Sequence, residues 1–234
     1  RYLFYKSGVT NLDVSNFDTS LVRDMQFMFG EISIKEINLK NFNTKNVVNM
    51  RNMFQSCRQL DSIDLSGFDT SNVEDMYQMF EACTSLTELD VSKFNTKKVK
   101  DMACMFRETY YVKSLDLSNF DTSNVKDMYS MFEGDHDLTS LNLGNFDCPN
   151  LITMEGMFSG CKELISIDLS NFKASSVRNM AYLFAGCEKL TSLNLSNFIT
   201  DKATGMSYMF ANCTKLKMLD ISNFNTSSVT SMIS

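Results

Sequence analysis

A single unit of about 26 residues repeats along the whole chain. The stretch LDLSNFDTSNVKDMYSMF at 115–132 occurs 52 residues earlier as IDLSGFDTSNVEDMYQMF at 63–80. Self-similarity at one period of this size is typical of a solenoid, in which stacked units bury a continuous core. Phenylalanine marks the period at positions 17, 42, 68, 94, 120, 146, 172, 198 and 224, in steps of 26 after a first step of 25.

Each unit reads as a short strand followed by a helix. In the unit that begins at residue 86, the alternation around Leu89–Val91 predicts a brief, half-buried strand. The second half has apolar residues spaced by 3, 3 and 1, which places them on one face of a helix. These apolar positions are Val99, Met102, Met105 and Phe106.

A threonine stands between the two halves of most units. It lies three residues before the first apolar position of the predicted helix, where its hydroxyl would cap free backbone N–H groups. In one unit, Ser71 and Glu74 also have the spacing of a capping box. The threonines are Thr19, Thr44, Thr70, Thr96, Thr122, Thr200 and Thr226.

The predicted fold class is therefore α/β, a leucine-rich-repeat-like solenoid with one domain over residues 1–234. About nine coils would place nine parallel strands in one sheet, roughly 40 Å long at about 4.8 Å per strand. Because helices are wider than strands, the strands would line the concave side and the helices the convex side. The chain begins and ends within a predicted helix, without polar end units, so we expect it to be an excerpt of a longer array with both caps missing.

The charge and hydropathy patterns argue against several classes of partner. The chain has a net charge of −6 and no run of basic residues, which argues against nucleic acid as a partner. No stretch approaches 18 apolar residues, so this segment is not expected to span a membrane. Its amino terminus, RYLFYKSGV, lacks the regions of a signal peptide, so an export signal and an anchor would lie outside the segment.

Five cysteines follow the Met-Phe pair of their coils by three residues. Clustered ligand spacing for a metal is absent, while disulfides between neighbouring coils would require Cα atoms within about 6 Å. Buried free thiols are the reading that we favour, and the other two stay open. Cys104 differs, because on the predicted helix it would face outward; we favour a coincidental position without a function, with a reactive thiol as the alternative. The column consists of Cys57, Cys83, Cys161, Cys187 and Cys213.

Catalysis has little support in the sequence. His136 is the single histidine and has no recurring nucleophile beside it, so we read it as an exposed turn residue. Repeated residues rarely build one asymmetric catalytic site, and the glycines match no phosphate-binding loop. We expect no enzyme activity and no cofactor.

The outward-facing positions of the predicted strands form a polar row, which we call the Asp ribbon. We take Asp64, Asp90, Asp116 and Asp168 from this row as candidate partner-binding residues. Stacked carboxylates repel one another and could recruit a basic partner or bind Ca²⁺ weakly, although a straight row offers a calcium ion few oxygens. A merely solvated face is the alternative. The whole ribbon is Asp13, Asn38, Asp64, Asp90, Asp116, Asn142, Asp168, Asn194 and Asp220.

Tyrosines at variable positions are the other candidates for partner binding. Tyr182 and Tyr208 have the same place in adjacent units and should stack on the outer face of neighbouring helices, with Phe27 in the same column. Tyr110 and Tyr111 lie on a return between a helix and a strand. Tyrosine is enriched at interfaces, but single exposed tyrosines are common.

The whole unit resembles the BspA-like leucine-rich-repeat surface proteins, which carry tandem copies of an L.LS.FDTSNV.DM..MF.GC pattern. The resemblance covers nearly the whole chain. It departs at Cys148 and Ala174 in the threonine column, and at Thr109 and Asp135 in the cysteine column. It implies a non-catalytic protein, secreted or at the cell surface, that adheres to a protein or glycan of a host or neighbouring cell. The alternative is a structural spacer or self-assembling array without a partner of its own, which the near-uniform Ser-Asp-Ser face would suit.

Overall fold

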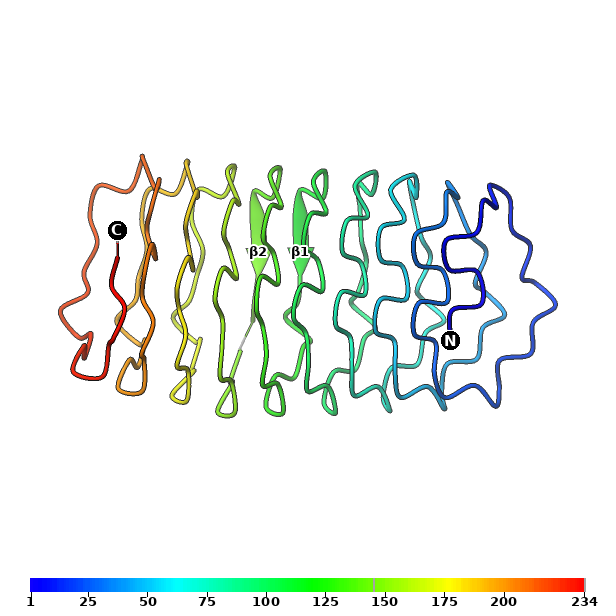
Figure 1. The fold of residues 1–234 in the computed structure, drawn as a ribbon, viewed down its shortest axis with the longest axis horizontal. Helices are drawn as coiled ribbons and strands as arrows, with labels where there is room; N and C mark the ends of the chain where they lie inside the picture. The colour runs from blue at the N-terminus through cyan, green and yellow to red at the C-terminus, as the bar shows by residue number, and fades with distance from the viewer. Residues whose placement is uncertain (145, 234) are drawn as a thin grey trace.

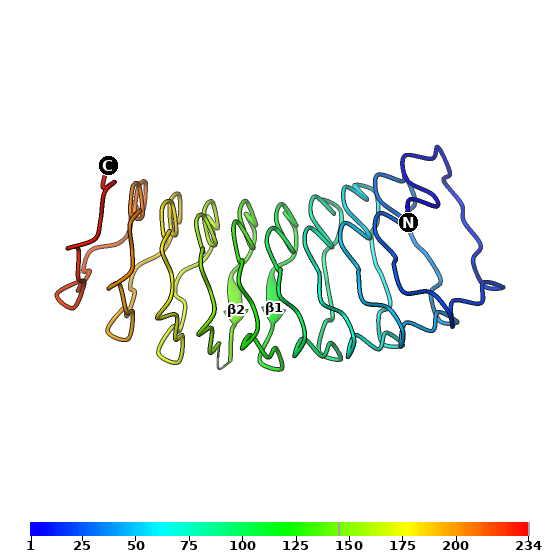
Figure 2. The same cartoon turned by 60° about the horizontal axis from the view of Figure 1, so that its bottom comes forward.

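The chain winds into a solenoid whose coils stack side by side along one long axis (Figure 1). This computed structural model describes residues 1–144 and 146–233. The N-terminal and C-terminal coils lie at opposite ends of the stack, and the stack bends into a shallow arc (Figure 2). The solenoid predicted from the 26-residue period is thus the observed architecture.

The two strands lie in neighbouring central coils. Strand β1 (Ser114–Asp116) pairs in parallel with β2 (Ser140–Asn142), and Leu115 stands opposite Leu141. A separate row of single parallel bridges joins the residues just before the first Met of successive coils, such as Asp75 with Asp101. Parallel pairing at the repeat period was predicted correctly, but the described residues do not form the predicted continuous sheet of nine strands.

The second half of each coil is a series of tight turns, and the described residues contain no helix. The amide of Met102 donates to the carbonyl of Asp127 in the next coil (3.0 Å), and that of Cys104 donates to Tyr129 (2.8 Å). The amide of Met105, which lies between them, closes a turn on Met102 (3.2 Å). Backbone groups that a helix would pair within itself thus pair between coils, and the prediction of one helix per repeat is wrong.

Left-handed residues within these turns also exclude a helix. Cys104 has a φ of 55° and Glu108 a φ of 60°, and equivalent positions in the other coils repeat this conformation. A positive φ at the third residue is what a type II turn requires, whereas an α-helix needs a negative φ throughout. The described residues have no wide helical layer, so helix width gives no reason for the strands to lie on the concave side.

The repeated apolar residues form the core, as predicted. Phenylalanine rings of successive coils stack nearly parallel, such as Phe106 on Phe132 with centroids 5.7 Å apart and planes 7° from parallel. The methionines of the interior coils are fully enclosed, including Met102 and Met105. Offset stacking of this kind stabilises each contact beyond its buried area. The full ladder is Phe4, Phe29, Phe54, Phe80, Phe106, Phe132, Phe158, Phe184 and Phe210.

The threonines that recur between the two halves of the units join coils instead of capping helices. The buried hydroxyl of Thr96 donates to the carbonyl of Asp121 in the next coil (3.0 Å) and accepts from the Asp121 amide (2.8 Å). The side chain therefore replaces a backbone partner between the two coils. The capping box is wrong as well, because Glu74 forms an ion pair with Lys100 (2.5 Å).

Candidate binding surfaces

Three Asp or Asn side chains in each coil of the N-terminal half fold back onto the backbone. In the coil that contains β1, the carboxylates of Asp116 and Asp121 accept from the amides of Ser118 and Ser123, each at 3.0 Å, and Asp127 accepts from Tyr129 at 2.8 Å. Such Asx turns change the direction of the chain locally. The signal for them was an Asp or Asn at three fixed positions of these units, which the prediction of a strand and a helix did not use.

The four candidate aspartates of the Asp ribbon all make this Asx turn. Each is exposed, and its Oδ1 accepts from the serine amide two residues later at 2.9 to 3.0 Å. The hydroxyl and amide of Ser66 lower the pKa of Asp64, and Ser92 does the same for Asp90. The ribbon is therefore anionic at neutral pH, and its free oxygens face solvent.

The Asp ribbon does not converge on a cation site. Within residues 1–144 and 146–233, no group of three or more His, Cys, Asp or Glu side chains is placed to hold a metal ion. The side chains step from coil to coil along a line, and one oxygen of each candidate carboxylate is already used by a backbone amide. The weak calcium site suggested by the sequence has no geometric support.

Tyr182 and Tyr208 form the stacked pair that the repeat period predicts. Their ring centroids are 5.0 Å apart and their planes are 15° from parallel, although they lie on turns and not on helices. Both backbones are left-handed, with φ of 57° and 56°, a conformation that costs a bulky residue about 1–2 kcal/mol. Tyr182 remains 42% exposed. A flat aromatic surface is therefore presented to solvent at a position where glycine or asparagine would be less strained.

Tyr110 and Tyr111 lie elsewhere, on the return before β1. The Tyr110 ring stacks on His136 of the next coil, with centroids 5.1 Å apart and planes 4° from parallel. Tyr111 points outward and is 54% exposed. The structure thus brings His136 to Tyr110 as a packing partner. The four candidate tyrosines belong to two separate places and not to one surface.

Two arginines on the turn face are surrounded by carboxylates, an arrangement that the sequence analysis missed. Arg107 lies 3.3 Å from Glu81 and 3.0 Å from Glu133, in the coils before and after its own. Arg51 lies over the ring of Tyr77 at 3.6 Å. Glu81, Arg107 and Glu133 are each the fifth residue after the first Met of their coils, so an alignment of the repeats could have shown that opposite charges alternate along this column.

Arg51 also faces a row of half-buried acids. Its guanidinium is 3.4 Å from Asp75 and 3.6 Å from Asp101. Burial, followed by the negative charges of Asp75 and Asp127, raises the pKa of Asp101 to about 6. The effect of burial on Asp101 therefore exceeds that of the arginine, and its carboxyl group is partly protonated in mildly acidic solution.

The seven cysteines are all free thiols in the part of the chain that the structure describes. The column thiols donate to phenylalanine carbonyls of the preceding coil, such as Cys83 to Phe54 at 3.1 Å. Burial raises the pKa of Cys57 to about 12, which keeps the thiol protonated. Cys104 was expected to face outward, but it is buried, and burial raises its pKa to about 12 as well. These thiols fill the core.

Asp135 occupies the cysteine column with a fully buried carboxyl group. Its Oδ1 accepts from the amide (2.8 Å) and the hydroxyl (3.0 Å) of Thr109, which replaces cysteine in the coil before. Its Oδ2 has no hydrogen-bond partner. Burial raises the pKa of Asp135 well above its ordinary value, so the neutral acid is the favoured form.

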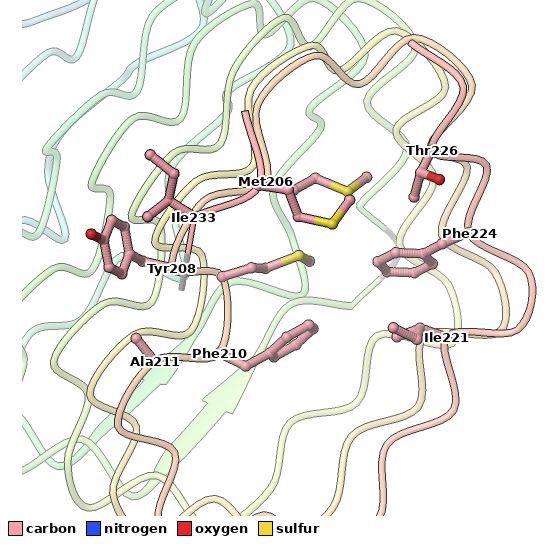
Figure 3. A pocket seen from close by; sticks show the side chains of 10 residues that line it. Met206, Tyr208, Phe210, Ala211, Ile221, Phe224, Thr226 and Ile233 are labelled. Atoms are coloured by element: carbon pink, nitrogen blue, oxygen red, sulfur yellow. The ribbon is translucent and has the colours of Figure 1, made fainter. Parts of the chain in front are cut away.

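A hollow of about 540 Å³ lies at the C-terminal coils, where Phe210 and Phe224 point into it from opposite sides (Figure 3). Tyr208 lies at one side of this hollow. In the interior coils, a further coil covers the equivalent phenylalanines. Among the described residues, no helix has the length and apolar character needed to cross a lipid bilayer.

Comparison with one solved structure supports the leucine-rich-repeat-like fold, and other leucine-rich repeat proteins are less similar. A T. pallidum leucine-rich repeat protein is 20% identical over 83% of this chain and 81% of its own, with a TM-score of 0.51. A leucine-rich repeat protein from Bacteroides ovatus is 16% identical, covering 91% of this chain and 64% of its own, with a TM-score of 0.45. A leucine rich cell surface protein from Faecalibacterium prausnitzii is 17% identical, covering 92% and 73%, with a TM-score of 0.40.

The sequence itself matches a family model. No curated protein sequence matches the chain. The model described as "Mycoplasma protein of unknown function, DUF285" matches residues 1–113, 62–166, 86–190 and 136–234, which together span the chain. The chain therefore belongs to the DUF285 family, and its repeats build a leucine-rich-repeat-like solenoid.

Proposed function

We propose that the chain is a non-catalytic recognition module, secreted or displayed at a cell surface, of the kind that its resemblance to BspA-like proteins implies. Its partner would be a protein or glycan of a host or neighbouring cell. The observation that carries this proposal is the exposed stack of Tyr182 on Tyr208. Their left-handed backbone is strained for tyrosine, and a flat aromatic surface suits the apolar face of a sugar or a partner's side chain.

The remaining candidates are weaker contact positions. Asp64, Asp90, Asp116 and Asp168 each keep one carboxylate oxygen toward solvent, which suits a basic partner lying along the Asp ribbon. Tyr111 would contribute as a separate exposed aromatic, with Tyr110 held beside it by His136.

A structural spacer is the alternative, and the Asx turns favour it. They give a local structural reason for the repeated aspartates that does not require a ligand. A spacer would maintain length and stiffness through the phenylalanine ladder and the threonine bridges alone.

A binding screen with matched variants separates the two functions. The chain is tested against a glycan array and against immobilised extracellular-matrix proteins, together with Tyr182→Ser/Tyr208→Ser and, as a control, Tyr77→Ser/Tyr129→Ser on the same face. If the chain is a recognition module, one of the two platforms should contain a ligand. Its binding should fall at least about tenfold in Tyr182→Ser/Tyr208→Ser and not in the control, since one aromatic hot spot contributes about 2 kcal/mol or more to binding. Equal binding by both variants, or no ligand on either platform, would refute the proposal and leave the spacer.

A further inference from the structure

One edge of the solenoid carries exposed cations, although the chain has a net charge of −6. We call this the basic edge and define it by Lys100, Lys126, Arg178 and Lys202, all of which are exposed. The amide of Lys126 donates to the Lys100 carbonyl (2.9 Å), that of Ile152 to Lys126 (2.9 Å), and that of Arg178 to Ile152 (2.8 Å). Lys100, Lys126, Ile152 and Arg178 therefore follow one another from coil to coil, at roughly 4.8 Å per step. Lys202 belongs to a neighbouring column of the next coil and lines the same hollow as Arg178.

The central cations of this edge have no carboxylate partner. Lys100 pairs with Glu74 at 2.5 Å, but no ion pair involving Lys126, Arg178 or Lys202 occurs within the described ranges. Arg107 and Arg51 differ, since Arg107 lies between carboxylates of the coils on either side and Arg51 faces carboxylates of the next two coils. An unpaired row of cations on an acidic protein creates a local positive potential, which attracts an anionic ligand.

The same edge is hollowed where the cations gather. A depression of about 460 Å³ is lined by Asn150, Ile152, Ser176, Arg178 and Lys202. The amide nitrogen of Asn150 already donates to the Ser123 carbonyl (2.8 Å), which leaves its oxygen to accept from a ligand. Ile152 is 49% exposed between the cations. The hollow thus combines positive charge, polar groups suited to hydroxyls and one aliphatic surface.

We propose that the basic edge binds an acidic polysaccharide, a chain of sugars bearing sulfate or carboxylate groups. Cations at multiples of the coil spacing match a polymer lying along the solenoid axis, with charges repeated along its length. The sugar hydroxyls would form hydrogen bonds with Asn150 and Ser176, and the apolar face of a sugar ring would pack on Ile152. Single-stranded nucleic acid is less suitable, because bases bind by stacking on aromatic rings and the lining of this hollow has none. This site is separate from the tyrosine stack, so the test of one proposal does not depend on the outcome of the other.

The test uses the whole chain and four labelled polymers. Binding of a heparin oligosaccharide (sulfated), an oligogalacturonate (carboxylated), a dextran oligosaccharide (neutral) and a single-stranded oligonucleotide is measured by fluorescence anisotropy at low and at moderate salt. The site variant is Lys126→Gln/Arg178→Gln/Lys202→Gln. The control variant, Lys35→Gln/Lys113→Gln/Lys217→Gln, removes the same number of charges from exposed lysines of the strand side. Circular dichroism checks that both variants fold.

The site variant should bind heparin or oligogalacturonate at least about tenfold more weakly than the unmodified chain, and the control should change little, because three exposed ion contacts together reach that size. Affinity of the unmodified chain should fall as salt rises, and dextran should not bind. If the site variant unfolds, Ile152→Asp places a negative charge in the same hollow and should weaken binding similarly. Equal loss in the control, no binding to either acidic polymer, or tighter binding of a single-stranded oligonucleotide of equal charge would overturn the proposal.

Discussion

Replacing Asp101 by asparagine should make the solenoid more stable at neutral pH and remove part of its pH dependence. Asp101 belongs to the half-buried acid row, with Asp75 and Asp127 in the coils on either side. Asparagine keeps the local turn, because Asn49 in the same column accepts from the Arg51 amide (2.9 Å) just as Asp101 accepts from Ala103 (3.0 Å). The substitution therefore removes the charge and leaves the backbone geometry intact.

The size of the effect follows from the pKa of Asp101. Burial raises it to about 6, against about 3.9 in an unfolded chain. As pH rises, the unfolded state loses its proton first, so stability falls between about pH 4 and 6 and stays lower above that range. Two pKa units correspond to about 3 kcal/mol, but the side chain is 31% exposed and is partly screened by solvent. We therefore expect Asp101→Asn to raise the free energy of unfolding by about 1–2 kcal/mol at pH 7.5.

Urea unfolding followed by circular dichroism at several pH values between 4 and 8 measures this directly. The difference between Asp101→Asn and the unmodified chain should be near zero at pH 4 and should grow to its full size above pH 6. Asp61→Asn, an exposed acid of the strand side, is the control and should change stability by less than about 0.5 kcal/mol throughout. A variant that is less stable than the unmodified chain at pH 7.5, or a difference that is the same at every pH, would refute this account of Asp101.

Three further results are expected. Asp135→Cys places the usual cysteine in this column and removes a buried carboxyl oxygen that has no hydrogen-bond partner. The melting temperature at pH 7.5 should therefore rise, by the equivalent of about 1–3 kcal/mol in the free energy of unfolding. A lower melting temperature would contradict the conclusion that the buried carboxyl group destabilises the fold. Thr96→Val should lower the free energy of unfolding in urea by about 1–3 kcal/mol, because the amide and carbonyl of Asp121 lose the hydroxyl that bonds both of them. A loss no larger than that of the control Ser71→Ala would contradict the bridging role. A thiol reagent such as DTNB should label Cys213 first, since it is the least buried cysteine, and should label the others only on unfolding; rapid labelling of Cys161 in the native chain would show that the core is open.

Burial was the part of the fold that the sequence predicted best. The positions of Met102, Met105 and Phe106 were assigned to the core and are buried there. A 26-residue period predicts which side chains meet, because each position packs on its own copy in the next coil. The stacking of Tyr182 on Tyr208 follows from the same reasoning and was found in the same way.

Backbone conformation was the part that the sequence could not decide. Apolar spacings of 3, 3 and 1 fit one face of a helix, but they fit a series of tight turns equally well. Cys104 and Gln78 have left-handed backbones at positions where side-chain type gives no warning. The helical wheel accounts for the burial of side chains and says nothing of where backbone hydrogen bonds go.

The candidate surfaces divide in a similar way. The Asp ribbon was correctly placed on the outside, yet its aspartates close Asx turns, which depend on the direction in which each carboxylate folds. The pairs of Arg107 and Arg51 with carboxylates of neighbouring coils, and the cluster of cations around Ile152, involve residues that vary between units. Such contacts come from the stacking of particular coils and not from the shared pattern.

By itself, the sequence determined that this chain is a solenoid, that its phenylalanine and methionine columns are the core, and that the Asp ribbon lies outside. Periodicity alone suffices for these statements, because identical units that stack must bury identical faces. Only the tertiary structure decided that turns replace helices. Alternate amides of these turns donate to carbonyls about 25 positions away in the next coil, and local propensity contains no information about a partner at that distance.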